Sequence, residues 1–141
     1  MKVFLGGTCN ESTWRDELIK MLKIDYFNPV VDDWTPECMA EEIRQRETCD
    51  FVLYVITPKM TGVYSIAEAV DDSNKRPKKT VFCFLDTDTV ADGMGLLYFT
   101  EGQKRSLIAV GKMIWNNGAA TFDNLKHVAD YLNGESGWIR N

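Results

Sequence analysis

The chain has 141 residues, of which 45% are hydrophobic and 26% are charged, and this composition is typical of folded globular proteins rather than disordered ones. Two domains within this length would each bury too little apolar surface, so we predict a single domain over residues 1–141. The net charge of −5 offers no basic field to a phosphate backbone, which argues against nucleic acid as a partner.

Cysteine spacing and the first residues bear on metals and compartment. The four cysteines show no CxxC spacing, and the single histidine, His127, is distant from them in sequence, so no metal site is predicted. The opening MKVFLGG has too short an apolar stretch for a signal peptide. No apolar run approaches the length of a membrane span. We therefore expect a cytoplasmic protein with reduced thiols and no membrane partner.

The first half of the chain alternates short apolar runs with longer amphipathic segments. The predicted elements are a strand at 3–5, a helix at 13–23, a strand at 26–29, a helix from Thr35 to about Cys49, and a strand at 51–56. The last of these is almost entirely apolar, which is typical of a strand covered by helices on both faces.

The second half continues the alternation. The predicted elements are a helix beginning at Ser65, a strand at 80–85, a helix at 103–116, a strand at 120–122, and a helix capped by Asp123 that ends at Asn133 and Gly134. Thr100 and Gln103 have the spacing of a capping box before the fourth helix. The long loop between the fourth strand and this helix, residues 86–102, is interpreted as a lid.

Five strands alternating with five helices predict an α/β protein with a three-layer flavodoxin-like fold. Its sheet would contain five parallel strands in the order 2-1-3-4-5. In such sheets ligands bind beyond the carboxyl ends of the strands, where the strand order reverses. The sequence therefore predicts a crevice between the loops 6–12 and 57–65.

Glu68 is the only charged residue between Lys59 and Asp71, and its neighbours are small and apolar. Ser65 and Glu68 have the spacing of a capping box, which is the interpretation that spacing alone favours. The alternative is chemistry, because a carboxylate among apolar neighbours beside a ligand crevice has the environment that raises a pKa.

Several fragments in order carry a family resemblance. They are VFLGGT at 3–8, Trp14 with Arg15, YFNP at 26–29, Cys49 with Asp50, and YSIAEA at 64–69. Together they resemble the small, single-domain members of the nucleoside 2-deoxyribosyltransferase-like family, over residues 3–85. The resemblance implies a flavodoxin-like enzyme that cleaves the N-glycosidic bond of a deoxynucleoside or its monophosphate. The deoxyribosyl group would pass to another base or to water, with no metal or organic cofactor.

The resemblance also implies catalytic roles. Glu68 aligns with the nucleophile, which would form a covalent glycosyl-enzyme. Asp50 matches an aspartate that helps to handle the base, although it could equally cap the turn before a strand. Many family members carry an aspartate six residues before the nucleophile, where this chain has Gly62. Proton donation to the base is thereby left to Asp50, Tyr64, a residue of the loop 86–102, or water.

Further residues are candidates for substrate binding, each with a structural alternative. Gly6, Gly7 and Thr8 would admit the nucleoside or simply form a tight turn. Arg15 would bind a phosphate or be a solvated arginine on the first helix.

Four more candidates follow the second and third strands. Trp34 would stack on a base or pack at the rim. Ser65 would bind a phosphate or hydroxyl at a helix start, cap that helix, or do both. Gly62 and Tyr64 lie in the same loop and complete the predicted binding set.

Alternatives remain open at this stage. The chain could be a non-catalytic nucleotide-binding module on the same fold, which the absent aspartate makes credible. A hydroxyl-rich stretch at 8–13 also faintly resembles the phosphate loop of flavodoxin. Transferase and hydrolase are not separated, nor are the base, the sugar and the need for a 5′-phosphate. Family members commonly complete the pocket with a neighbouring subunit, so a homodimer or higher oligomer is expected, with Trp138 as one contact.

Overall fold

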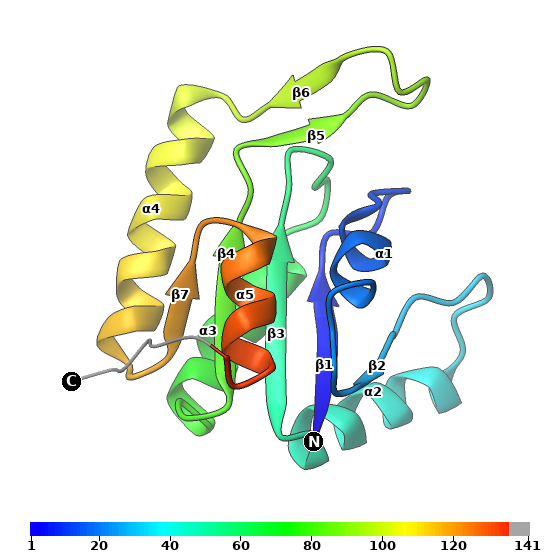
Figure 1. The fold of residues 1–141 in the computed structure, drawn as a ribbon, viewed down its shortest axis with the longest axis vertical. Helices are drawn as coiled ribbons and strands as arrows, with labels where there is room; N and C mark the ends of the chain where they lie inside the picture. Colours follow the sequence, from blue (N-terminus) through cyan, green and yellow to red (C-terminus); the bar gives the residue numbers. More distant parts are fainter. Residues whose placement is uncertain (136–141) are drawn as a thin grey trace.

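The computed structural model describes residues 1–135, so the expected oligomer contact at Trp138 lies outside the described residues. A parallel sheet of five strands forms its centre, in the order β2-β1-β3-β4-β7 (Figure 1). These strands are β1 (Lys2–Gly7), β2 (Asp25–Phe27), β3 (Phe51–Ile56), β4 (Thr80–Phe84) and β7 (Ala120–Phe122). Because β7 is the fifth strand of this sheet, the predicted order is confirmed.

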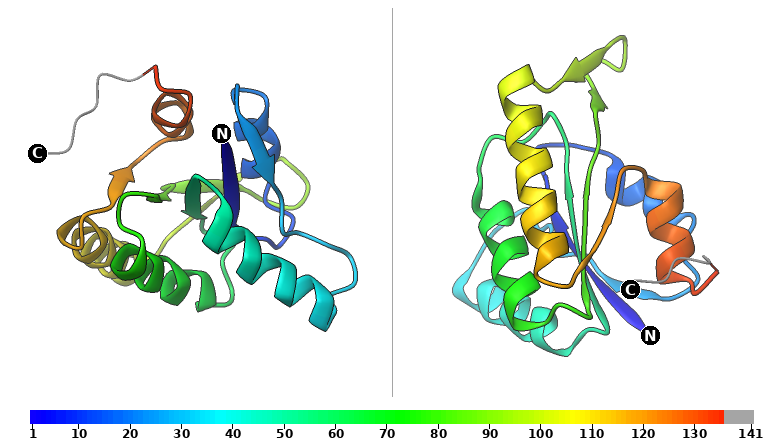
Figure 2. Two further views of the ribbon diagram at one scale, coloured as in Figure 1. Left: turned by 90° about the horizontal axis from the view of Figure 1, so that it is seen from below. Right: turned by 90° about the vertical axis from the view of Figure 1, so that its left-hand side faces the viewer.

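Helices cover both faces of the sheet and complete three layers (Figure 2). One face carries α2 (Pro36–Thr48), α3 (Tyr64–Lys75) and α4 (Glu101–Asn116), and the other carries α1 (Trp14–Ile19) and α5 (Leu125–Leu132). Within the part of the chain that the structure describes, no helix is long and apolar enough to cross a membrane. The predicted flavodoxin-like fold is confirmed.

Two hydrophobic cores follow from the alternation of side chains along the strands. Val3 and Leu5 pack in the core on the α1 and α5 side, whereas Phe4 and Tyr54 pack in the core on the other side. Since β1 and β3 are buried on both faces, their sequences read as continuous apolar runs.

Helix starts agree with the sequence in some places and differ in others. Thr100 and Gln103 form the predicted capping box of α4. The cap of α5 is Asn124 rather than Asp123, because the Asn124 side chain accepts from the backbone N–H of His127. Helix α3 begins at Tyr64 without any side-chain cap, so the predicted box of Ser65 and Glu68 is not formed.

The predicted long loop at 86–102 contains an antiparallel hairpin of β5 (Thr87–Thr89) and β6 (Leu96–Tyr98). The hairpin projects above the carboxyl edge of the sheet (Figure 1). Asp88 fastens it there, since its Oδ2 accepts from the hydroxyls of Ser12 and Thr57, both at 2.6 Å.

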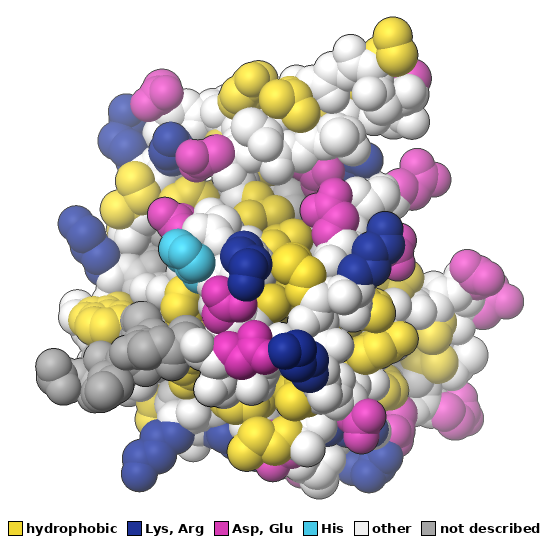
Figure 3. Space-filling view, in the orientation of Figure 1, with side chains coloured by type: hydrophobic (Ala, Val, Ile, Leu, Met, Phe, Trp, Pro, Cys, Tyr) yellow, Lys and Arg dark blue, Asp and Glu magenta, His cyan; other side chains and the backbone are white. Residues whose placement is uncertain are grey.

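The tip and second strand of the hairpin expose apolar side chains along the top of the molecule (Figure 3). These residues are Met94, Leu96, Leu97 and Tyr98. Isolated exposed apolar residues are ordinary, but a group of four on one projecting element marks a surface with the character of a contact site.

Candidate active site

The loops that follow β1 and β3 are joined by hydrogen bonds at the carboxyl edge of the sheet. The Thr57 backbone N–H donates to the Thr8 hydroxyl at 2.9 Å. The Asn10 side-chain amide donates to the Lys59 carbonyl at 2.8 Å and to the Thr61 hydroxyl at 3.0 Å. The two loops therefore form one preorganised unit at the point where the strand order reverses.

A cavity of about 170 Å³ lies between these loops. Its lining consists of Gly7, Thr8, Cys9, Asn10, Ile56, Met60, Thr61, Gly62, Tyr64 and Ser65. Five of the predicted binding residues are thus brought together. The sequence analysis missed Asn10. Its left-handed φ of 46° is visible only in the structure, and such angles at non-glycine residues often accompany functional loops.

The two glycines of β1 have different roles. A Cβ on Gly7, whose φ is +119°, would lie 2.0 Å from the Val55 carbonyl oxygen, so no side chain fits where β1 meets β3. A Cβ on Gly6 would lie 2.7 Å from the ring of Tyr54. Gly6 does not line the cavity, and its missing side chain makes room for that ring.

Arg15 is almost fully buried, with 5% of its surface exposed, so the solvated alternative is wrong. Its guanidinium donates to the carbonyl oxygens of Leu5 at 3.0 Å, Thr8 at 2.7 Å and Gly7 at 3.4 Å. It also stacks on the ring of Trp14 at 4.4 Å. Burial lowers the pKa of Arg15. The side chain supports the loop from behind and does not line the cavity.

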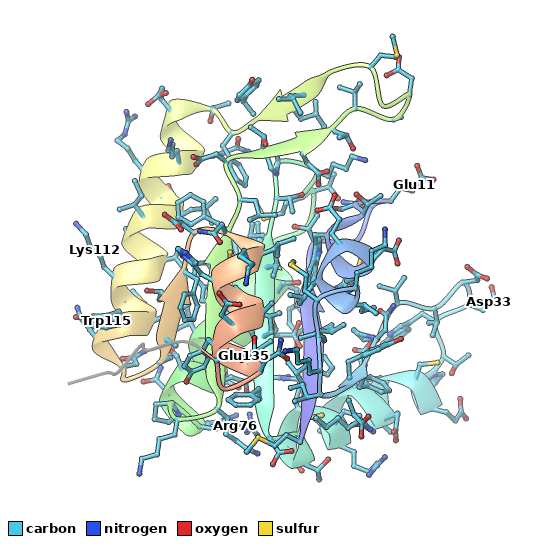
Figure 4. The ribbon with its side chains drawn as sticks, in the orientation of Figure 1. Glu11, Asp33, Arg76, Lys112, Trp115 and Glu135 are labelled. Atoms are coloured by element: carbon cyan, nitrogen blue, oxygen red, sulfur yellow. The ribbon has the colours of Figure 1, made fainter. Side chains whose placement is uncertain are left out.

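Trp34 and Asp50 are not brought to the cavity. Trp34 is 55% exposed on the connection between β2 and α2, and Figure 4 shows its neighbour Asp33 pointing out at the side of the molecule. Asp50 precedes β3 at the amino edge of the sheet, where its carboxylate accepts from the Lys2 backbone N–H at 2.8 Å. The six residues of β3 separate Asp50 from the carboxyl edge by about 20 Å. This contact joins the start of β3 to the start of β1, so the carboxylate has a structural partner different from the turn cap that the sequence suggested.

Glu68 lies one helical turn after Tyr64 and Ser65, which line the cavity, and residues at this spacing are neighbours on a helix surface. Its side chain is 18% exposed and pairs with Arg46 of α2, with 3.2 Å between Oε2 and the guanidinium nitrogen. Burial raises the pKa of Glu68, Arg46 opposes that rise, and the carboxylates of Glu42, Asp72 and Asp71 add to it. Carboxylates with a pKa raised in this way occur at catalytic sites and also in structural ion-pair networks.

A buried network holds Arg46 in place. Its Nε and one terminal nitrogen donate to the two oxygens of Asp72 at 3.1 and 3.0 Å. Asp72 has no exposed surface, accepts from the Tyr54 hydroxyl at 2.5 Å and also pairs with Arg76. Burial raises the pKa of Tyr54, and so does the Asp72 carboxylate, which keeps its hydroxyl a donor. Sequence analysis missed this network because its members come from α2, β3 and α3.

A larger cavity of about 880 Å³ lies between α4, β7 and α5. Lys112 and Trp115, which line it, lie across the molecule from Glu11 of the first loop (Figure 4). It contains none of the predicted site residues. We place the candidate site at the smaller cavity, because it lies at the strand switch point and holds five of the predicted residues. Glu68 does not line this cavity and lies one helical turn from Tyr64 and Ser65, which do.

Fold and site together define a flavodoxin-like α/β protein whose cavity lies where such proteins bind their ligands. Residues 1–87 match the family model described as nucleoside 2-deoxyribosyltransferase like. The chain belongs to that family, and at the level of the family it is an enzyme acting on nucleosides. A comparison with curated proteins finds no match. The family match includes β1 to β4 and both loops of the cavity.

Proposed function

We propose that this protein cleaves or transfers at the N-glycosidic bond of a deoxynucleoside or nucleoside, or of its 5′-monophosphate, with Glu68 as the nucleophile. The observation that carries the proposal is the position of Glu68. It lies one turn from the cavity at the switch point, is mostly buried and is paired with an arginine. The resemblance of residues 64–69 to the family pattern supports the same residue as the nucleophile.

The proposed reaction has two steps at one carbon. The Glu68 carboxylate attacks the anomeric carbon of the sugar while the bond to the base breaks, and the electron pair of that bond passes to the base nitrogen. Water or a second base then attacks the same carbon and gives its proton to the group that protonated the first base, the ester bond to Glu68 breaks, and the carboxylate is restored. Gly62 leaves space for the sugar in the cavity, with Ser65 at the helix start beside it.

The departing base needs a proton. Asp50 lies at the opposite edge of the sheet, and Asp88 of the hairpin is held by two hydroxyls. Tyr64 lines the cavity. We therefore propose Tyr64 or a water molecule as the donor, in place of the aspartate that the family pattern has at position 62.

The cavity of about 170 Å³ is smaller than most ligand sites, which measure about 300–1,000 Å³. It suits the sugar, so the base needs a further wall. We propose that a second subunit supplies this wall in a homodimer or higher oligomer, as family members commonly do. The exposed side chains of Leu96 and Tyr98 on the hairpin are suitable contacts. Sedimentation of the wild type beside a variant with serine at both positions tests this, with dissociation as the expected result.

The test of the reaction is chromatography of free base after incubation with each deoxynucleoside and deoxynucleoside monophosphate, with and without a second base. The variant is Glu68→Gln, and Glu101→Gln, at the exposed start of α4, is the control. We expect base release that Glu68→Gln abolishes and the control retains. New nucleoside formed with the second base identifies a transferase, and free base alone identifies a hydrolase. Release that survives in Glu68→Gln contradicts the proposal.

A second candidate is a nucleotide-binding module without turnover. Gly62 favours it, because the family aspartate at this position is absent. Calorimetric titration with the same nucleosides distinguishes the two candidates. Binding without base release, at an affinity that Glu68→Gln leaves unchanged, would establish the module.

A further inference from the structure

We propose that Arg46 is the positioning residue of the nucleophile, holding one carboxylate oxygen of Glu68 so that the other is left for attack. This inference rests on the proposed function. Arg46 is not one of the residues that line the cavity, so it would act through Glu68 and not on the substrate.

The geometry of Arg46 fixes both the residue and its partner. Two of its three guanidinium nitrogens are bound to Asp72, and the remaining one lies 3.2 Å from Glu68 Oε2. A planar fork bound at two points cannot rotate freely, so the third nitrogen has a fixed direction. Only 14% of the Arg46 side chain is exposed, and this limits screening of the pair by solvent.

Asp72 anchors the Arg46 side chain. It is fully buried and is also bound by Tyr54 from the sheet and by Arg76 from its own helix. The chain of contacts therefore runs from β3 through Asp72 and Arg46 to Glu68. Arg46 also lies 3.6 Å from Asp71, but Glu68 is the one of these carboxylates that lies a single helical turn from the cavity lining.

Several neighbouring carboxylates disfavour the ionised form of Glu68, and Arg46 acts against them. Glu42 of α2 and the carboxylates of Asp71 and Asp72 on α3 face it, together with the Tyr54 hydroxyl from the sheet and the Arg46 cation. Burial and three carboxylates all favour a protonated Glu68, which cannot attack. The positive charge of Arg46 favours the ionised form of Glu68. It also stabilises the carboxylate that forms again when the ester bond breaks in the second step.

The experiment compares Arg46→Gln and Arg46→Lys with the control Arg44→Gln. Arg44 lies on the same helix but pairs with exposed Glu41. The first readout is the titration of Glu68 by NMR of carboxyl-labelled glutamate without substrate, assigned by loss of the signal in Glu68→Gln. The second is the pH profile of kcat/KM for base release. Asp72 keeps Tyr54 and Arg76 in Arg46→Gln, and circular dichroism confirms that each variant is folded.

We expect the Glu68 midpoint and the acid limb of kcat/KM to rise together by about 1–2 pH units in Arg46→Gln. Arg46→Lys should restore part of the shift, and Arg44→Gln should match the wild type. An unchanged Glu68 midpoint in folded Arg46→Gln overturns the inference and leaves Arg46 as a clamp between helices. If the wild type releases no base, the proposed function fails, and the titration still decides whether Arg46 controls Glu68.

Discussion

Replacing Gly62 with aspartate would restore the carboxylic acid that the family pattern has six residues before the nucleophile. The site has room for it. Gly62 lines the cavity, and a Cβ built on it meets nothing within 4 Å. The backbone there is not left-handed, so Gly62→Asp introduces no strain. We expect its free energy of unfolding to stay within about 0.5 kcal/mol of the wild type.

The expected gain comes from proton donation to the base. A positioned general acid contributes about 10²–10⁴ in rate. The aspartate would stand on an exposed loop without the supporting contacts of an evolved acid, so the predicted rise can be smaller than the lower end of that range. A tenfold rise in kcat for base release corresponds to about 1.4 kcal/mol of transition-state stabilisation, and this is the smallest rise that we predict.

The assay is chromatography of free base at saturating nucleoside between about pH 3.5 and about pH 8, because an exposed aspartate has a pKa of about 3.9 and ionises within this range. Gly62→Asn is the matched control, since it has the shape of aspartate but no acidic proton. The Asp variant should gain activity that falls again as its new carboxyl ionises, and the Asn variant should not. An equal rise in both variants, or a rise that persists when Glu68→Gln is added, would refute the reasoning.

Three further predictions concern stability and reactivity. Because burial raises the pKa of Glu68, ionising it weakens the fold as pH rises through and above its ordinary value. Glu68→Gln should therefore unfold at higher urea than the wild type at pH 7 but not at pH 3.5, and equal midpoints at both would contradict this. Gly7→Ala should lose at least about 3 kcal/mol by thermal or urea unfolding, against almost nothing for Gly62→Ala; a small loss would mean that β1 can move away from β3. Burial raises the pKa of Cys83 to about 12, so iodoacetamide at pH 8 should label exposed Cys9 first, and mass spectrometry of peptides reveals any reversal.

The strand order was predictable because apolar runs and amphipathic segments alternate along the chain, and few topologies satisfy that alternation. The loops of the cavity followed, since the order of strands fixes where loops meet. The start of α3 was predicted to within one residue, but the absence of a side-chain cap there was not. Ser65 and Glu68 have the spacing of a capping box, and in the structure the Glu68 carboxylate pairs with Arg46 instead. That pairing is visible only when α2 lies beside α3.

Single residues were harder to assign than elements. Arg15 reads from sequence as a phosphate ligand or a solvated side chain, yet three carbonyl oxygens of β1 and its loop surround it. Asp50 adjoins a strand, and nothing in the sequence says that its carboxylate binds the start of β1. Both cases depend on backbone groups, which carry no sequence signal.

The polar groups at the carboxyl edge divide into two sets, and the division bears on specificity. One set consists of the side chains of Thr8, Asn10 and Asp88, whose hydrogen bonds join the loops and the hairpin. Tyr64 and Ser65 line the cavity, and their hydroxyls form no hydrogen bond with another side chain or backbone group of residues 1–135. Two hydroxyls can orient a sugar or a phosphate, but they cannot distinguish one base from another. Under the proposed function, selection of the base would therefore fall to a surface beyond these two hydroxyls, and the hairpin, which Asp88 fastens to Ser12 and Thr57, lies at the same edge of the sheet (Figure 1).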